Sequence, residues 1–261
     1  MSQAPSSAGR SGVTIGIVFA LPIEADAFTR SAREVVSIEA AGLTFHQGDV
    51  AGRSVAWCVG GAGASAATRA TRLLIAGHRP RLIMSAGFAG ALAPELVRGA
   101  VIEPVRAVRD TAGPPLALGI QPAPMPPPQP SSAAAVTGAT IVSVGDVVAS
   151  SAAKQLLAAA TGASLVDMET YAVAEVAHAA RIPCAAVRVV SDTAGQELPR
   201  EVTALARPQS GMRRLGAALG AIGRRPGAAL DLWHLWENAV VDGRTLGHAV
   251  EDLCRRHPAD A

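Results

Sequence analysis

Five short, continuous apolar runs constrain the fold of this chain most strongly. They are VTIGIVFAL (13–21), RSVAWCVGG (53–61), RLIMSAG (81–87), TIVSV (140–144) and CAAVRVVS (184–191). Such runs are typical of strands that are buried on both faces. Segments with helical patterning separate them, at 22–32, 63–77, 151–161 and 169–181. This alternation predicts a three-layer α/β/α fold with a mostly parallel sheet. Segment 99–110 follows without a helix, so we expect the sheet to be mixed there.

The length of 261 residues suits one α/β domain. We expect residues 1–12 to be a disordered tail and residues 13–261 to form a single domain. Segment 112–134 is rich in proline and lacks a periodic pattern, which predicts a loop. Residues 208–257 are expected to form a run of helices that closes the fold.

Composition excludes several classes of partner. A net charge of +2 gives no basic field for nucleic acid, and 3% aromatic residues leave few platforms for base stacking. The three cysteines, Cys58, Cys184 and Cys254, lack the spacing of a zinc site or disulfide framework, which favours a reducing cytoplasm. No apolar run reaches the roughly 18–20 residues of a membrane span, and a secretory signal is not expected. Lys154 is the only lysine, which a GC-rich coding bias would explain.

Polar residues and glycines gather where the predicted strands end. Glu24 follows the first strand, GGAGAS the second and GFAGA the third, while Met168–Glu169 and Ser191–Asp192 follow later strands. Ligands of open α/β sheets bind outside the carboxyl ends of the strands. Each acid also has a plainer interpretation, as a helix-dipole acid at Glu24, a cap or turn acid at Asp192, and a helix-opening acid at Glu169. Their convergence is what indicates a site.

The segments IGIVFALPIEAD, GGAGASAA, SAGFAGALAPEL, VDMETYAVAEVA and VRVVSD occur in this order between residues 13 and 195. This series resembles the nucleoside phosphorylase superfamily, and most closely its methylthioadenosine/S-adenosylhomocysteine nucleosidase branch. The resemblance implies an enzyme that cleaves the N-glycosidic bond of a purine nucleoside without a metal or organic cofactor. It makes Asp192, protonated, the general acid toward the base and Glu24 the acid that activates water, with Arg188 nearby. Glu169, ionised, would bind the ribose hydroxyls, and Met168 would pack on the sugar.

The resemblance also implies a lining for the substrate, formed by Gly87, Phe88, Ala89, Val147, Val148 and Ser191. Phe88 stands where these nucleosidases usually have a small polar residue, and Val147–Val148 replace an aromatic. These departures leave the 5′-substituent and the exact base open. The short middle segment and the arginine- and proline-rich C-terminal region resemble a hopanoid-biosynthesis-associated phosphorylase group, whose suggested substrate is adenosylhopane.

Three functions therefore remain as hypotheses. Hydrolysis is favoured because Glu24 would repel phosphate. Phosphorolysis is the alternative, with Arg53, Arg69 and Arg72 as candidate phosphate ligands, although surface positions suit them better. A nucleoside-binding module without catalysis is the third.

The segment ALDLWHLWENAVV (229–241) places Leu230, Trp233, Trp236 and Val240 on one helical stripe. We interpret this stripe as a cover for the core or for a subunit interface in a homo-oligomer. The alternative is a peripheral membrane contact, or an approach for a lipid-linked substrate.

Overall fold

The computed structural model describes residues 13–110, 113–119, 138–198 and 228–257. The strands of these ranges are β1 (Ile15–Phe19), β2 (Arg33–Ala40), β3 (Leu43–Val50), β4 (Arg53–Val59), β5 (Leu82–Ala91), β6 (Val101–Ile102), β7 (Arg106–Arg109), β8 (Leu116–Ala117), β9 (Thr140–Ser143), β10 (Leu165–Asp167) and β11 (Cys184–Asp192). The helices are α1 (Pro22–Ser31), α2 (Ala64–His78), α3 (Ser151–Thr161), α4 (Thr170–Ala179) and α7 (Ala228–Arg256).

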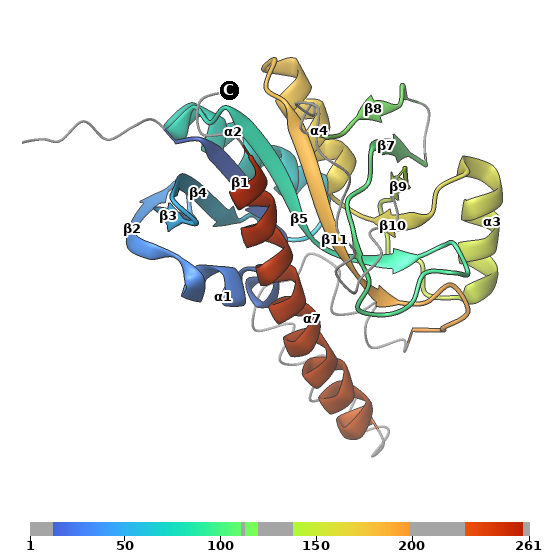
Figure 1. Ribbon diagram of the computed structural model, residues 1–261. Coiled ribbons are helices and arrows are strands. Elements are labelled where there is room, and N and C mark those ends of the chain that lie inside the picture. Colours follow the sequence, from blue (N-terminus) through green and yellow to red (C-terminus); the bar gives the residue numbers. More distant parts are fainter. Residues whose placement is uncertain (1–12, 111–112, 120–137, 199–227, 258–261) are drawn as a thin grey trace, which may run out of the picture.

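In the described ranges the strands form one mixed sheet (Figure 1). Its main order is β2-β3-β4-β1-β5-β10-β9-β7-β8, and β11 pairs with β5 and β6. Strands β4, β1, β5 and β11 are parallel neighbours, so their carboxyl ends share one edge of the sheet. Strand β10 runs antiparallel to β5 and parallel to β9. The predicted mixed sheet is confirmed, and the shared edge is where the predicted acids should meet.

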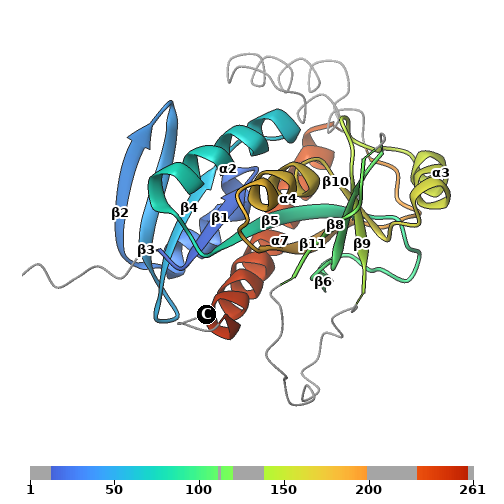
Figure 2. The same cartoon turned by 90° about the horizontal axis from the view of Figure 1, so that it is seen from above.

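Helices cover the two faces of the sheet (Figure 2). Helices α2 and α4 lie on one face, and α7 lies on the other, packed against α1. Side chains of β5 alternate accordingly, since Ile83 and Ala89 belong to the first core and Met84 and Ala86 to the second. Strand β1 (IGIVF) is buried throughout, as its unbroken apolar sequence predicts. The three-layer α/β/α prediction is thus confirmed.

The sequence did not predict the hairpin of β2 and β3. Strand β2 lies at the sheet edge and is exposed along its whole length, with Val36 and Ile38 at 44% and 53% exposure. A register shift between Arg33 and Val36, and a positive φ of 52° at Glu34, break any regular alternation. A strand with no buried face leaves no periodic pattern to detect.

Two other predictions are revised by the structure or concern residues that it does not describe. The predicted loop 112–134 contains the short strand β8, which pairs with β7, while residues 120–137 lie outside the described residues. The same holds for the predicted tail at 1–12 and for the N-terminal part of the expected C-terminal helices. From Ala228 on, the chain forms the single long helix α7. The side chains of Leu230, Trp233 and Trp236 also lie outside the described residues, so the stripe stays a prediction.

The cysteines are small buried side chains in the described structure. Cys58, Cys184 and Cys254 are buried free thiols, and burial raises the pKa of each to about 12. Within the described ranges no group of three or more His, Cys, Asp or Glu residues could hold a metal ion. No helix within these same ranges has the length and apolar character needed to cross a membrane.

Candidate active site

A small polar pocket lies at the shared carboxyl edge of the sheet. Its polar walls come from Glu24, Ser85, Glu169 and Arg188. The rest of the lining is small or apolar: Val18, Phe19, Ala20, Gly61, Ala67, Ala86 and Gly87. The pocket therefore joins the end of β1 and the middle of β5 to α1 and to the N-cap of α4, whereas Asp192 is not among its lining residues.

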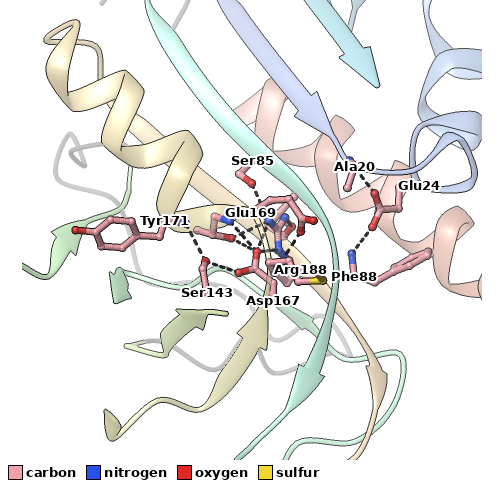
Figure 3. Close-up of polar contacts among 12 residues, drawn as sticks. Ala20, Glu24, Ser85, Phe88, Ser143, Asp167, Glu169, Tyr171 and Arg188 are labelled. Atoms are coloured by element: carbon pink, nitrogen blue, oxygen red, sulfur yellow. Dashed lines mark hydrogen bonds and ion pairs between the residues drawn. The ribbon is translucent and has the colours of Figure 1, made fainter. Parts of the chain in front are cut away.

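Glu24 is held by backbone donors on both of its carboxylate oxygens (Figure 3). Oε2 accepts from the amides of Ala20 and Leu21 at 3.0 and 2.8 Å, and Oε1 accepts from the amide of Phe88 at 2.9 Å. The first two bonds make Glu24 the capping acid of α1, and the third ties it to β5. The side chain is only 3% exposed. Burial raises the pKa of Glu24, although these hydrogen bonds oppose the change. A buried acid with a raised pKa is suited to accept a proton.

Glu169 sits at the N-cap of α4 and faces the N-terminus of α2. Its Oε1 accepts from the amide of Gly63 at 2.6 Å, and Gly63 adopts a φ of +93° that favours glycine. Burial, followed by the charge of Asp167, raises the pKa of Glu169 to about 7. The carboxyl therefore exists in both protonation states near neutral pH, whereas the sequence led us to expect a plainly ionised group.

Arg188 is 2% exposed and lies beneath the pocket as part of a buried network. Its Nε and Nη2 donate to Asp167 Oδ2 at 3.2 and 2.8 Å, and Nη2 also lies 2.7 Å from Ser85 Oγ and Thr170 Oγ1. Asp167 in turn accepts from Ser143 Oγ at 2.6 Å. Arg188 acts on Glu24 through its charge, which lowers the pKa of that acid. The guanidinium charge is thus already paired before any ligand binds.

Asp192 ends β11 and pairs with a lysine. Lys154 Nζ, on α3, lies 2.5 Å from Asp192 Oδ2, and the two side chains are almost fully buried. On the other oxygen, Ser191 Oγ lies 2.7 Å from Oδ1 and 3.3 Å from the carbonyl of Ala89. A hydroxyl has one proton, so Ser191 can donate either to Asp192 or to Ala89. A lysine partner for the predicted general acid was not expected from the sequence.

Two glycines of β5 make room for the two predicted catalytic acids. A Cβ at Gly87 would lie 2.8 Å from Glu24 Oε1, and a Cβ at Gly90 would lie 3.0 Å from Asp192 Oδ2. Both distances are shorter than side chains tolerate without a shift. Three residues of a strand span about 10 Å. Strand β5 therefore sets the spacing between the acids.

The other predicted lining residues contribute in different ways. The Phe88 ring packs in the core beneath α1 and α7 and points away from Arg188, so Phe88 reaches Glu24 through its backbone amide (Figure 3). Met168 and Val148 pack against the core around β9 and β10, and Val147 is half-buried. Segment 145–149 meets the chain after β11 through the amide of Leu198, which donates to the carbonyl of Ala149 at 2.8 Å.

The three arginines considered for phosphate lie away from the pocket. Arg53 begins β4, at the opposite end of that strand from the carboxyl edge. Arg69 is exposed on α2 and donates to the carbonyl of Ala41, and Arg72 is exposed on the same helix. Among the residues that the structure describes, Arg188 alone brings a cationic side chain to the pocket lining.

Sequence reasoning missed Ser85, Ser143 and Lys154. Ser85 is a polar residue inside the apolar run RLIMSAG, and Lys154 is a single lysine in an arginine-rich chain. Those two signals were available. Ser143 ends an apolar strand, and nothing in its sequence indicates its bond to Asp167.

Curated proteins and solved structures are similar to this chain in sequence and in fold. The chain is 27% identical over 207 residues to the 5′-methylthioadenosine/S-adenosylhomocysteine nucleosidase of Tolumonas auensis, covering 71% of this chain and 88% of that protein. It is 32% identical over 90 residues to the nucleosidase of the same name from Pseudoalteromonas translucida, a match that spans 34% of this chain and 38% of that protein.

Among solved structures, the nucleosidase of that name from Neisseria meningitidis, in complex with methylthio-immucillin-A, has a TM-score of 0.71 at 17% identity, covering 94% of this chain and 99% of that one. Futalosine hydrolase of Helicobacter pylori has a TM-score of 0.65 at 17% identity, covering 92% and 98%. These likenesses confirm the fold.

The model of the phosphorylase superfamily matches residues 14–222, most of the chain. The match, with these relatives, confirms the predicted enzyme class of nucleosidases and nucleoside phosphorylases and the predicted likeness to the nucleosidase branch. The chain therefore belongs to the phosphorylase superfamily.

Proposed function

We propose that this protein hydrolyses the N-glycosidic bond of an adenosine-type nucleoside that carries a 5′-substituent. One observation carries the proposal: the pocket holds two carboxyl groups, and its guanidinium is already paired with Asp167. Such a pocket suits a neutral nucleophile next to a sugar that becomes positively charged.

The three acids divide the chemistry between them. Cleavage leaves positive charge on the ribose and negative charge on the base. Glu169, in its ionised form, would stabilise the sugar charge and accept hydrogen bonds from the ribose hydroxyls. Glu24 would take a proton from the attacking water, which its raised pKa favours. Asp192, on the far side of Gly90, would protonate the departing purine, a contribution that is typically worth about 10²–10⁴-fold.

Water is favoured over phosphate by the charges of the pocket. A phosphate dianion would meet Glu24 and Glu169, and its binding would need cationic donors that are free to turn toward it. Arg188 is occupied by Asp167, Ser85 and Thr170. The carboxylates would therefore repel phosphate, whereas a water molecule can donate to Glu24.

The adenosine class is supported by the relatives, since several are named for methylthioadenosine and S-adenosylhomocysteine. The 5′-substituent is the finer part of the proposal. Methylthio and homocysteinyl groups and the hopanoid chain of adenosylhopane are the candidates, the last from the sequence features of the C-terminal region.

The test is base release from methylthioadenosine, S-adenosylhomocysteine, inosine, futalosine and adenosylhopane, each with and without phosphate. We expect release from at least one adenosine-type nucleoside at the same rate in both conditions, with a free sugar as product. Strict phosphate dependence with a sugar 1-phosphate product would make the protein a phosphorylase. Tight binding by calorimetry without release from any nucleoside would make it a binding module.

A further inference from the structure

We propose that Lys154 positions Asp192 and holds the proton that base release consumes. This inference rests on the proposed function, because it assigns the source of the proton for the same reaction. It adds to the site a residue from α3, a helix that contributes nothing else to the polar network.

Lys154 is fully buried and uses all three of its donors. Nζ lies 2.5 Å from Asp192 Oδ2, 2.7 Å from the carbonyl of Thr193 and 3.0 Å from that of Gln196. Lys154 is the one fully buried residue of α3, while Leu157 and Ala158 are only partly buried against the core and the other residues are partly or fully exposed. An ammonium presents three donors on a compact head, which the planar guanidinium of arginine cannot reproduce.

A contribution to folding stability does not by itself explain why the ion pair of Lys154 and Asp192 is buried. Burying two charges costs more desolvation than their attraction usually returns, and apolar replacements of buried pairs are often neutral or stabilising. One proton shift from Nζ to Oδ2 converts the ion pair into a neutral amine and a carboxylic acid. Because a dry environment disfavours separated charge, a nucleoside that covers the 8% of the Asp192 side chain that is exposed would favour this neutral form. Asp192 would then carry a proton when the base needs one.

The proposed step is balanced in protons and electron pairs. The C1′–N9 bond breaks and its electron pair leaves with the purine. Asp192 gives a proton to N7 of the base and takes one from Lys154, so the ammonium becomes an amine and the carboxylate ends as it began. Water adds to C1′ and loses a proton to Glu24. After the products leave, solvent removes the proton from Glu24 and restores the ammonium of Lys154.

The surroundings of the pair are suited to such a transfer. Ser191 Oγ lies 2.7 Å from Asp192 Oδ1, so its hydroxyl can go on donating to that oxygen when Oδ2 carries the proton. The next charged groups on β11 and β10, Arg188 and Asp167, are paired with each other, and Glu169 is bonded to Gly63. Within the described residues, Lys154 and Asp192 form an ion pair with each other and with no other residue.

The kinetic test compares Lys154→Met, Lys154→Arg and Asp192→Asn, with Gln155→Met as the matched control. Gln155 is the exposed neighbour on α3. We expect Lys154→Met to lower kcat at neutral pH by about 10²–10⁴-fold, with KM within threefold of the parent. Its kcat should then recover about tenfold for each pH unit toward acid, since Asp192 would take its proton from solvent. Arginine should not restore kcat, because it does not release a proton in this range.

A purely structural lysine would behave differently. Lys154→Met would then lose kcat by one factor at every pH, as Asp192→Asn is expected to do, or lose only thermal stability. Full rescue by Lys154→Arg, or a parental kcat in Lys154→Met, would also overturn the proposal. Circular dichroism on each variant separates these outcomes from a failure to fold.

A second measurement does not need turnover. Since Lys154 is the only lysine, uniform ¹⁵N-lysine labelling gives one side-chain Nζ resonance from the parent chain. We expect a slowly exchanging ammonium signal that changes toward the neutral amine when methylthio-immucillin-A binds. A fast-exchanging signal, or one unaffected by the analogue, would overturn the inference. If the parent releases no base yet shows this change, the proposed function fails while the proton-holding pair stands.

Discussion

The two halves of the site hold their carboxyl groups in different ways. Glu24 and Glu169, which we assign to the sugar side, are bonded by backbone amides of Ala20, Leu21, Phe88 and Gly63. Asp192, which we assign to the base side, is bonded by the ammonium of Lys154. A backbone amide orients a carboxylate but cannot give up its proton, whereas an ammonium can. One half is therefore built to stabilise charge and accept a proton, and the other to supply one.

The largest effect is expected at the base side. Asp192→Asn keeps an oxygen for Lys154 but removes the transferable proton, so kcat should fall by about 10²–10⁴-fold. KM should change little, because the sugar side is untouched. Steady-state kinetics on the preferred nucleoside measure both values. If the variant keeps the parental kcat, Asp192 does not take part in the reaction, and the two halves of the site do not differ in function as we propose.

Glu24→Gln should reduce kcat by about 10²-fold through loss of the proton acceptor. It should also reduce stability, because the new amide NH₂ faces a backbone N–H of Ala20, Leu21 or Phe88 and leaves a buried donor unsatisfied at a cost of about 1–3 kcal/mol. Urea unfolding and kinetics on one preparation measure both effects. Unchanged stability would show that backbone donors do not hold this carboxylate.

Adding a methyl group next to Glu24 should disturb the sugar side of the site, and adding one next to Asp192 should disturb the base side. Gly87→Ala would press on Glu24 and Gly90→Ala on Asp192, each with an expected loss of about tenfold in kcat/KM, about 1.4 kcal/mol of transition-state stabilisation. Only Gly90→Ala should alter the Lys154 Nζ resonance. Gly77→Ala is the control, since that position on α2 has open space and should gain up to about 1 kcal/mol of stability. Equal effects of all three would mean that close packing at β5 is irrelevant.

The protonation of Glu169 should appear in the pH dependence of stability. Its pKa of about 7, raised from 4.5 mainly by burial, means that the folded protein binds this proton more tightly than the unfolded chain does. The resulting stabilisation is fully present below pH 4.5 and is lost as the pH rises through 7. Glu169→Gln should therefore be more stable than the parent at pH 8, by about 1–3 kcal/mol, and similar to it at pH 4.

The pH dependence of nucleoside binding should run opposite to that of stability, so that binding strengthens as the pH rises. Nucleoside KM in the parent should fall several-fold as the pH rises from 6 to 8, because the ionised carboxyl binds the ribose hydroxyls. Glu169→Gln should show a higher KM without this dependence. A parental profile in the variant would assign the titration to another group.

The difference between the halves also explains what the sequence could predict. Glu24, Glu169 and Asp192 each follow a strand-like run, and parallel strands bring such positions together, so the acids could be found from the pattern. Lys154 lies 38 residues from Asp192 on a helix, and coding bias explained its rarity without pointing to its location. The hairpin of β2 and β3 escaped because β2 buries neither face. Phe88 was expected in the lining, but strand alternation turns its ring to the opposite core and leaves only its amide at the site.

The central claim is that water, and not phosphate, attacks the sugar. The most direct measurement is the mass of the sugar released from methylthioadenosine, or from whichever nucleoside proves to be the substrate, in H₂¹⁸O with phosphate present. We predict a free sugar that gains one ¹⁸O atom in a single turnover, a product that Glu24→Gln forms about 10²-fold more slowly. A sugar 1-phosphate without ¹⁸O at C1′ would contradict the account, because the carboxylate-lined pocket would then bind the dianion that we infer it repels.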